Sequence, residues 1–228
     1  MKEDRHYTDL LKAHKIYISS DIEGRWKFYD TYMKDKDPEV WFKSGDIPLK
    51  EGLFLFGFIH SWDPNFQGDL AKFLKIYKGT FSILKEFERK TIIKVDLSAQ
   101  VKNHISGIFD RIANCPRKRR FESTDASKIL HTIIPELFVM WDDKIRKEIV
   151  GDAKDGRCYA FEFLPKMQES AKQYLDSYIK EKGGNYESAI LQISEMADNY
   201  TLAKLIDEYN YVRYKYRKSL SEIRSVTL

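Results

Sequence analysis

Apolar side chains recur every three or four residues along most of this chain, which is the spacing of one face of an α-helix. Close to the start, this spacing is followed by Tyr7, Leu10, Leu11, His14, Tyr17 and Ile18. Residues that interrupt helices are few, since 228 residues contain only 11 Gly and 6 Pro. The pattern therefore predicts an all-α fold.

Capping residues and breakers divide the pattern into about nine or ten helices in a single compact domain spanning residues 1–228. They are expected at residues 7–18, 20–33, 48–59, 70–88, 98–112, 125–134, 163–179, 185–197 and 201–212, with a further one around 142–146. Ser20 and Glu23 form the pattern of a capping box before the second helix. The helix over 48–59 is apolar nearly all round, which favours a central position. The only β-like run is Thr91–Val95, and a weak subdivision would fall near 90–96.

Size and composition favour a folded protein that needs no metal, cofactor or disulfide for stability. Hydrophobic residues make up 43% and charged residues 32% of the chain, and a chain of this length buries roughly 70% of its unfolded surface. The first residues are charged and resemble no signal peptide, and no apolar run approaches the ~18 residues of a membrane span. We therefore expect a cytoplasmic protein with reduced Cys115 and Cys158 and no membrane association. Heavy use of Lys, Glu, Ile and Tyr is typical of thermophiles.

A run of four cations, Arg117, Lys118, Arg119 and Arg120, follows Pro116 in an expected loop. Adjacent cations can bind several phosphates and release counterions, which makes this run a candidate nucleic-acid-binding segment. The mildly basic balance, with a net charge of +4, permits such a partner. The alternative is a solvated loop whose cations lie near the end of the preceding helix, where its dipole favours them.

Residues 123–146 carry the most informative pattern in the chain. A short amphipathic run ends at Pro135, and an apolar run up to Trp141 leads into two acids. If residues 125–134 are helical, Lys128 points toward solvent and His131 lies at the border of the apolar face. If residues 137–141 are extended, Asp142 or Asp143 caps the next helix. If that helix instead starts at Pro135, Asp142 pairs with Arg146 one turn later. Lys128, His131 and Asp142 are the candidate catalytic residues.

A pocket lined by tryptophans is a second candidate feature. His60 and Trp62 end one apolar run, Trp141 ends another, and each run leads into an acid. These three residues are the candidate pocket residues, although the tryptophans equally suit a core. His60 and Asp63 have the spacing of a metal-binding pair, but no second pair with usable spacing occurs, so no metal site is predicted.

The segment Ser127-Lys128-x-Leu130-His131, Pro135-x-Leu137-Phe138 and Trp141-Asp142 resembles a set of uncharacterised prokaryotic all-helical proteins. The order of lysine, helix, proline, apolar run and capping aspartate is similar to the catalytic half of the helix-hairpin-helix DNA glycosylases. That resemblance implies that Lys128 attacks the sugar C1′ and that Asp142 assists and stabilises charge. Where that family has a Gly-x-Gly before the lysine, this chain has residues 124–127, Thr-Asp-Ala-Ser.

Two functions from different classes follow. The first is engagement of nucleic acid or phosphate groups, with base-excision chemistry at Lys128. The second is a helical interaction or scaffold protein without catalysis, because a solvated helix surface, a cap or a core position also accounts for each candidate residue. Neither the oligomeric state nor the ligand follows from the sequence.

Overall fold

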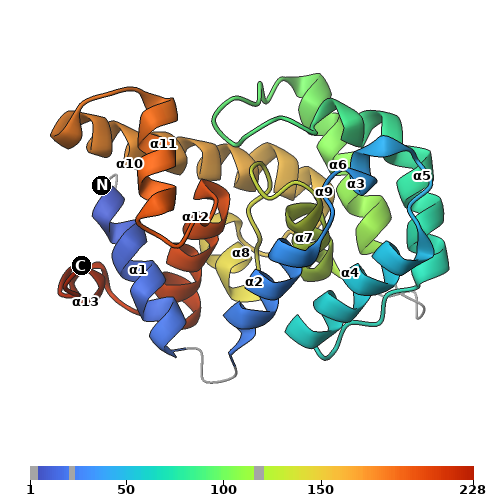
Figure 1. Cartoon of the computed structure of the whole chain (residues 1–228), viewed down its shortest axis with the longest axis horizontal. Helices are drawn as coiled ribbons and strands as arrows, with labels where there is room; N and C mark the ends of the chain where they lie inside the picture. Colours follow the sequence, from blue (N-terminus) through green and yellow to red (C-terminus); the bar gives the residue numbers. More distant parts are fainter. Residues whose placement is uncertain (1–4, 21–23, 116–120) are drawn as a thin grey trace.

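The computed structural model describes residues 5–20, 24–115 and 121–228 (Figure 1). Its helices are, in chain order, α1 (Tyr7–Ser20), α2 (Arg25–Asp35), α3 (Val40–Lys43), α4 (Leu49–Trp62), α5 (Leu70–Glu86), α6 (Ala99–Ala113), α7 (Ser123–Ile133), α8 (Asp143–Val150), α9 (Gly156–Cys158), the π-helical segment η1 (Tyr159–Phe163), α10 (Leu164–Lys182), α11 (Tyr186–Glu195), α12 (Leu202–Asn210), the π-helical segment η2 (Tyr211–Lys215) and α13 (Leu220–Arg224).

The predicted all-α class is confirmed, and the described residues contain ten helices of seven or more residues and no strand. The β-like run forms a turn instead, in which the amide of Val95 donates to the carbonyl of Thr91 at 2.9 Å. The side-chain amide of Gln168 donates to the carbonyl of Ile92 at 2.8 Å, which holds this turn against α10. Among the described residues, no helix has the length and apolar character needed to cross a membrane.

Four of the predicted helix starts are confirmed by their caps. Side-chain oxygens of Ser98, Asp142, Asn185 and Thr201 accept backbone N–H groups in the first turn of α6, α8, α11 and α12, as N-cap residues do. The predicted box at Ser20 is wrong in one respect, because Ser20 is the last residue of α1 and the N-cap of α2 is Gly24. Glu23 lies outside the described residues.

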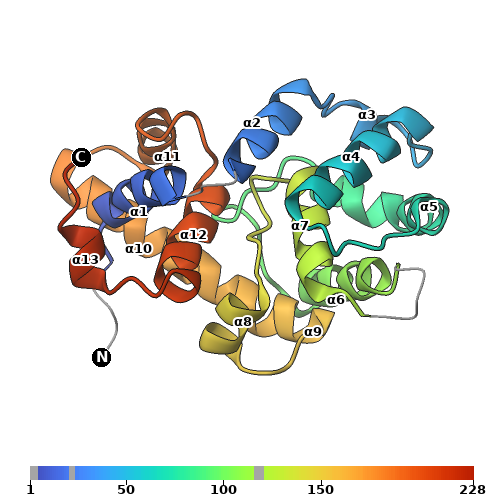
Figure 2. The same cartoon turned by 90° about the horizontal axis from the view of Figure 1, so that it is seen from below.

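Helices from the two ends of the chain lie side by side. α1 packs against α12, α10 and α13, while α4 packs against α2, α5 and α7 (Figures 1 and 2). Buried apolar side chains from both groups belong to one contiguous cluster. The central position predicted for α4 from its nearly all-round apolar character is wrong, because Leu49 and Leu53 are 60% and 56% exposed. One face of α4 is buried and the other faces solvent.

Trp141 is a core residue that fixes the segment before α8. Its side chain is 1% exposed, and its ring centroid lies 5.6 Å from that of Phe109 and 5.0 Å from that of Tyr159. Its indole N–H donates to the carbonyl of Ser123 at 3.1 Å, which satisfies the one polar atom of the ring. The extended segment is thereby held against α7, next to Lys128.

Candidate functional site

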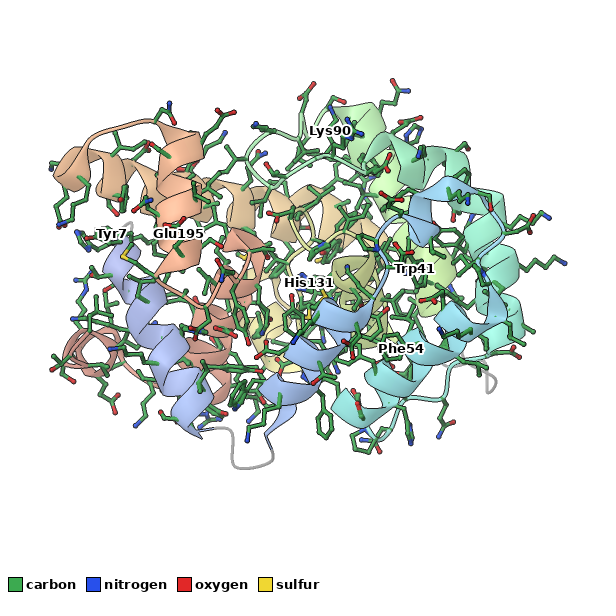
Figure 3. All side chains as sticks on the ribbon, viewed as in Figure 1. Tyr7, Trp41, Phe54, Lys90, His131 and Glu195 are labelled. Atoms are coloured by element: carbon green, nitrogen blue, oxygen red, sulfur yellow. The ribbon has the colours of Figure 1, made fainter. Side chains whose placement is uncertain are left out.

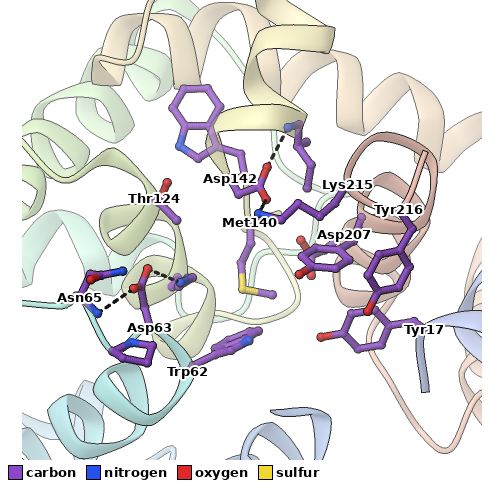
Figure 4. A pocket seen from close by; sticks show the side chains of 15 residues that line it. Tyr17, Trp62, Asp63, Asn65, Thr124, Met140, Asp142, Asp207, Lys215 and Tyr216 are labelled. Atoms are coloured by element: carbon purple, nitrogen blue, oxygen red, sulfur yellow. Dashed lines mark hydrogen bonds and ion pairs between the residues drawn. The ribbon is translucent and has the colours of Figure 1, made fainter. Parts of the chain in front are cut away.

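A cavity of about 300 Å³ lies where the end of α4, α7, the segment before α8, α12 and η2 meet (Figure 4). Lys128, Asp142, Trp62 and Trp141, all named from the sequence, line it. The hydroxyl of Ser127 explains part of this convergence, because it donates to the carbonyl of Trp141 at 3.2 Å. Lys128 and Asp142, the neighbours of these two residues, are thereby brought to the same cavity.

Lys128 does not extend into solvent as the helical pattern predicted. Its side chain is 13% exposed, and its ammonium lies 3.0 Å from Oδ2 of Asp63, the residue that ends α4. The ammonium also lies 5.7 Å from the ring centroid of Trp62. The sequence pattern could not show this, because both partners of Lys128 come from the end of α4, which packs against α7.

Asp142 is the N-cap of α8, which confirms the first of the two expected geometries. Its Oδ1 accepts the amide of Ile145 at 2.8 Å, and its Oδ2 lies 2.9 Å from the ammonium of Lys215. The alternative partner, Arg146, instead lies 3.0 Å from Oδ1 of Asp143. Lys128 and Asp142 thus face one cavity but are ion-paired to different residues.

Replacing Asp142 by alanine is expected to lower the free energy of unfolding by about 1 kcal/mol, because the first turn of α8 loses its cap. Asp142→Asn keeps an oxygen for the amide of Ile145 and removes only the charge toward Lys215, so we expect a smaller loss. Chemical denaturation of both variants measures the difference. Equal losses would show that the cap contributes nothing beyond the ion pair.

His131 does not line the cavity, and the expected border position is wrong. The side chain is fully buried in the centre of the molecule, behind α2 (Figure 3). Its Nδ1 lies 2.6 Å from the carbonyl oxygen of Phe138, and its Nε2 lies 2.8 Å from the hydroxyl of Tyr29. Burial lowers its pKa to about 3, so the ring is neutral. These contacts make His131 a structural link between α2, α7 and the following segment.

His60 is also separated from the other pocket candidates. It is exposed and borders a different hollow, together with Leu53 and Phe66. The separation of two residues, roughly half a helical turn, therefore places His60 and Trp62 on different faces of α4. The cation run Arg117, Lys118, Arg119 and Arg120 lies outside the described residues.

The charged residues of α12 were not anticipated from the sequence. Every residue of this helix is buried, including Lys204, Asp207 and Glu208. The ammonium of Lys204 lies 3.2 Å from Oδ2 of Asp207 and 3.1 Å from Oε1 of Glu208. The other oxygen of Glu208 lies 2.7 Å from Nδ1 of His14 on α1. The only sequence signal was the i, i+3, i+4 spacing of one cation and two acids, which is common on exposed helices.

Aromatic rings surround the buried cation. The ammonium of Lys204 lies 4.6, 5.0 and 5.7 Å from the ring centroids of Tyr17, Tyr29 and Trp62. Burial alone lowers the pKa of Lys204, but the negative charges of Glu208 and Asp207 outweigh it and raise the pKa well above the ordinary value. Lys204 is therefore a permanent cation beneath the cavity, and Tyr17 and Trp62 contribute both to its surroundings and to the cavity wall.

The π-helical segment η2 supplies the opposite wall. Its wider turn, in which the amide of Tyr216 donates to the carbonyl of Tyr211 at 3.0 Å, directly follows α12. Tyr211, Lys215 and Tyr216 all line the cavity. Short π-helical turns inside longer helices often occur at functional sites.

Asp207 is the lining carboxyl group with the clearest pKa shift. Burial raises its pKa to about 6, Lys204 acts in the opposite direction, and Glu208 raises it further. A carboxyl group with a shifted pKa in a cavity is a physical indicator of a functional site.

In the described part of the chain, no three His, Cys, Asp or Glu residues are arranged to hold a metal ion.

Comparison of the chain with protein-family models, with curated proteins and with solved structures finds no match.

Proposed function

We propose that the cavity binds one nucleotide unit of a nucleic acid and that Lys128 can carry out base-excision chemistry there. The observation that carries this proposal is the convergence of Lys128, Asp142 and Trp62 on one cavity, although Trp62 is far from the other two in the sequence. Aromatic rings of Trp62, Tyr211 and Tyr216 can stack on a base. Proteins that act on a base take it out of the stack into such a pocket.

The proposed covalent step requires a neutral amine at Lys128. Asp63 is placed to accept the proton, since its Oδ2 lies 3.0 Å from the ammonium. The amine then adds to C1′ of the ring-opened sugar at an abasic site, and loss of water leaves an imine. Asp142 would stabilise the positive charge that develops during these steps, in line with the resemblance to the helix-hairpin-helix DNA glycosylases.

Borohydride trapping tests this chemistry directly. Incubation with abasic DNA and borohydride is expected to yield a covalent adduct, because hydride reduces the imine to a stable amine. Lys128→Ala should abolish the adduct, whereas Lys180→Ala, at an exposed position of α10, should leave it unchanged. Asp63→Asn should reduce its rate of formation.

Gel shifts with single- and double-stranded DNA at low and moderate salt test the binding step separately. We expect affinity to fall as salt rises, because phosphate contacts release counterions. Absence of salt-sensitive binding at micromolar protein would refute nucleic-acid engagement. Binding without an adduct would leave engagement standing and refute the excision chemistry.

A non-catalytic interaction protein is the second candidate, and exposed apolar side chains favour it. Phe28 on α2 is 47% exposed, and Leu49 and Leu53 on the neighbouring α4 are 60% and 56% exposed. Leu53 also borders a hollow together with Phe56 and Phe66, and exposed apolar groups that lie together are typical of interaction surfaces. A concentration-dependent dimer in analytical ultracentrifugation that Leu53→Lys disrupts would support this function.

A further inference from the structure

Three carboxyl groups line the cavity, and one of them differs from the others in where its cation lies. Asp63 and Asp142 are each within 3.0 Å of a lysine, Lys128 and Lys215 respectively. Both of these lysines line the cavity themselves. The cation of Asp207 is Lys204, which is 1% exposed and lies beneath the cavity rather than in its wall. Asp207 therefore presents hydrogen-bond acceptors to the cavity, and its ion-pair partner lies outside the wall.

The position of Asp207 is fixed by the buried contacts of α12. Lys204 lies 3.2 Å from its Oδ2 and shares its charge with Glu208, which is in turn held by His14 at 2.7 Å. A carboxylate oxygen has more than one lone pair, so Oδ2 can bind a ligand donor while contacting Lys204. A ligand that enters the cavity thus meets a preorganised acceptor group with two oxygens.

The surrounding rings select a planar ligand. Tyr17, Trp62, Tyr211 and Tyr216 line the same cavity as Asp207, and its volume of about 300 Å³ suits a base with part of its sugar (Figure 4). Stacking on such rings does not depend on which base is bound. Selection between bases must therefore come from the polar groups, and Asp207 is the acceptor whose cation lies outside the wall.

We propose that Asp207 selects a guanine-type base by accepting its two adjacent N–H donors. A carboxylate offers two acceptors side by side, and guanine presents the ring N1–H next to the exocyclic N2 amino group. Adenine and cytosine each place an acceptor nitrogen beside their amino group, and uracil or thymine flanks its single N–H with two carbonyls. Guanine is the only common base whose edge matches a carboxylate in both positions. This inference names the ligand class of the cavity for which we propose nucleotide binding.

The protonation of Asp207 gives this selection a pH dependence. Lys204 and Glu208 face Asp207 from its own helix, and Tyr17, Asp142, Tyr159 and Lys215 face it from the other elements. Burial raises the pKa of Asp207 to about 6. Below that pH the carboxyl group carries a proton and offers one donor and one acceptor, which no longer matches guanine. Guanosine binding should therefore weaken as the pH falls from 7.5 to 5.

Calorimetric titration with free nucleosides tests the proposal on the intact protein. At pH 7.5 guanosine is expected to bind at least about tenfold more tightly than adenosine or cytidine. Inosine, which keeps N1–H and lacks the amino group, should bind with intermediate affinity. Equal affinities for guanosine and adenosine would overturn the proposal, and so would guanosine affinity that does not change between pH 7.5 and 5.

Asp207→Asn is the decisive variant, because an amide replaces one acceptor by a donor at nearly the same size. It should weaken guanosine binding at least about tenfold and gain binding of xanthosine, whose carbonyl at position 2 accepts from the amide. Asp96→Asn, at an exposed position outside the cavity, serves as the matched control and should retain the guanosine preference. A gain of xanthosine binding cannot arise from unfolding. If Asp207→Asn does not fold, the nucleoside selectivity of the unmodified protein and its pH dependence still decide the proposal.

Free nucleosides also separate this proposal from the proposed function. Guanosine selectivity without salt-sensitive DNA binding or borohydride adducts would uphold the role of Asp207 and refute the nucleic-acid chemistry at Lys128. Adducts on abasic DNA together with equal affinities for all nucleosides would support the chemistry at Lys128 and refute the selection of guanine by Asp207.

Discussion

Replacing Lys204 by methionine is expected to lower the free energy of unfolding by about 3–5 kcal/mol, because two acids then lose their buried cation. Asp207 and Glu208 are 6% and 0% exposed, so solvent cannot compensate for the missing charge. Methionine preserves most of the aliphatic stem, so little packing volume is lost, while the contacts of the ammonium with the rings of Tyr17 and Trp62 disappear together with the charge. Urea denaturation at pH 7 measures the effect.

Two further variants separate charge from packing at this position. Lys180→Met removes an exposed lysine of α10 and is expected to change stability by less than about 0.5 kcal/mol. The double variant Lys204→Met with Glu208→Gln should be more stable than Lys204→Met alone, since removing one partner of a buried pair is more destabilising than removing both. A double variant that is less stable than Lys204→Met would contradict the role of Lys204 as the cation that balances the charge of Glu208.

Local patterns were sufficient to predict the fold class. The helical spacing, the serine, threonine, asparagine and aspartate caps, and Gly183 at the end of α10 are properties of short segments, and all act within one or two turns. Ser98, Asn185 and Thr201 occupy the caps expected from the sequence. The apolar character of α4 was misleading, because the sequence cannot show which apolar face finds a partner helix and which remains exposed.

The cavity could be predicted only in part. Lys128 and Asp142 are close in sequence, and the pattern between them indicated both the helix end before Pro135 and the cap of α8. Asp63, the ion partner of Lys128, comes from a distant helix, so no local spacing indicates it. The π-helical turn that brings Lys215 to Asp142 also leaves no periodic signal in the sequence.

The buried charges of α12 show why composition was misleading there. Lys, Asp and Glu are usually exposed, so their presence within Leu202–Asn210 predicts a solvent-facing stripe. The structure instead covers that stripe with α1, where His14 supplies a partner for Glu208, and with aromatic rings that surround Lys204. Whether such a stripe is buried depends on long-range packing, which the sequence pattern does not show. In this packing Asp207 lies at the cavity.

His131→Leu is expected to lower the free energy of unfolding at pH 7 by about 3–5 kcal/mol, because two buried groups lose their partner. The hydroxyl of Tyr29 and the carbonyl of Phe138 both contact the imidazole in a region without solvent. Leucine is similar in size, so the loss comes from the missing hydrogen bonds more than from a cavity. Thermal and chemical denaturation of the variant measure it.

The pH dependence of the stability loss in His131→Leu tests whether the buried imidazole of His131 has a lowered pKa. Burial lowers the pKa of His131 from 6.5 to about 3 in the folded protein, so below pH 6.5 the unfolded chain binds one proton more than the folded protein. The unmodified protein therefore loses about 1.4 kcal/mol of stability per pH unit through His131 as the pH falls from 6.5 toward 3. His131→Leu has no imidazole at this position and does not lose stability in this way. The difference in free energy of unfolding between the variant and the unmodified protein should therefore shrink by about 1.4 kcal/mol per pH unit between pH 6.5 and 4.5.

His60→Leu, at an exposed position, is the control, and its free energy of unfolding should differ little from that of the unmodified protein at every pH. A deficit for His131→Leu that stays constant over this range would mean that the folded imidazole takes up its proton as readily as the unfolded one, contrary to its burial between α2 and α7.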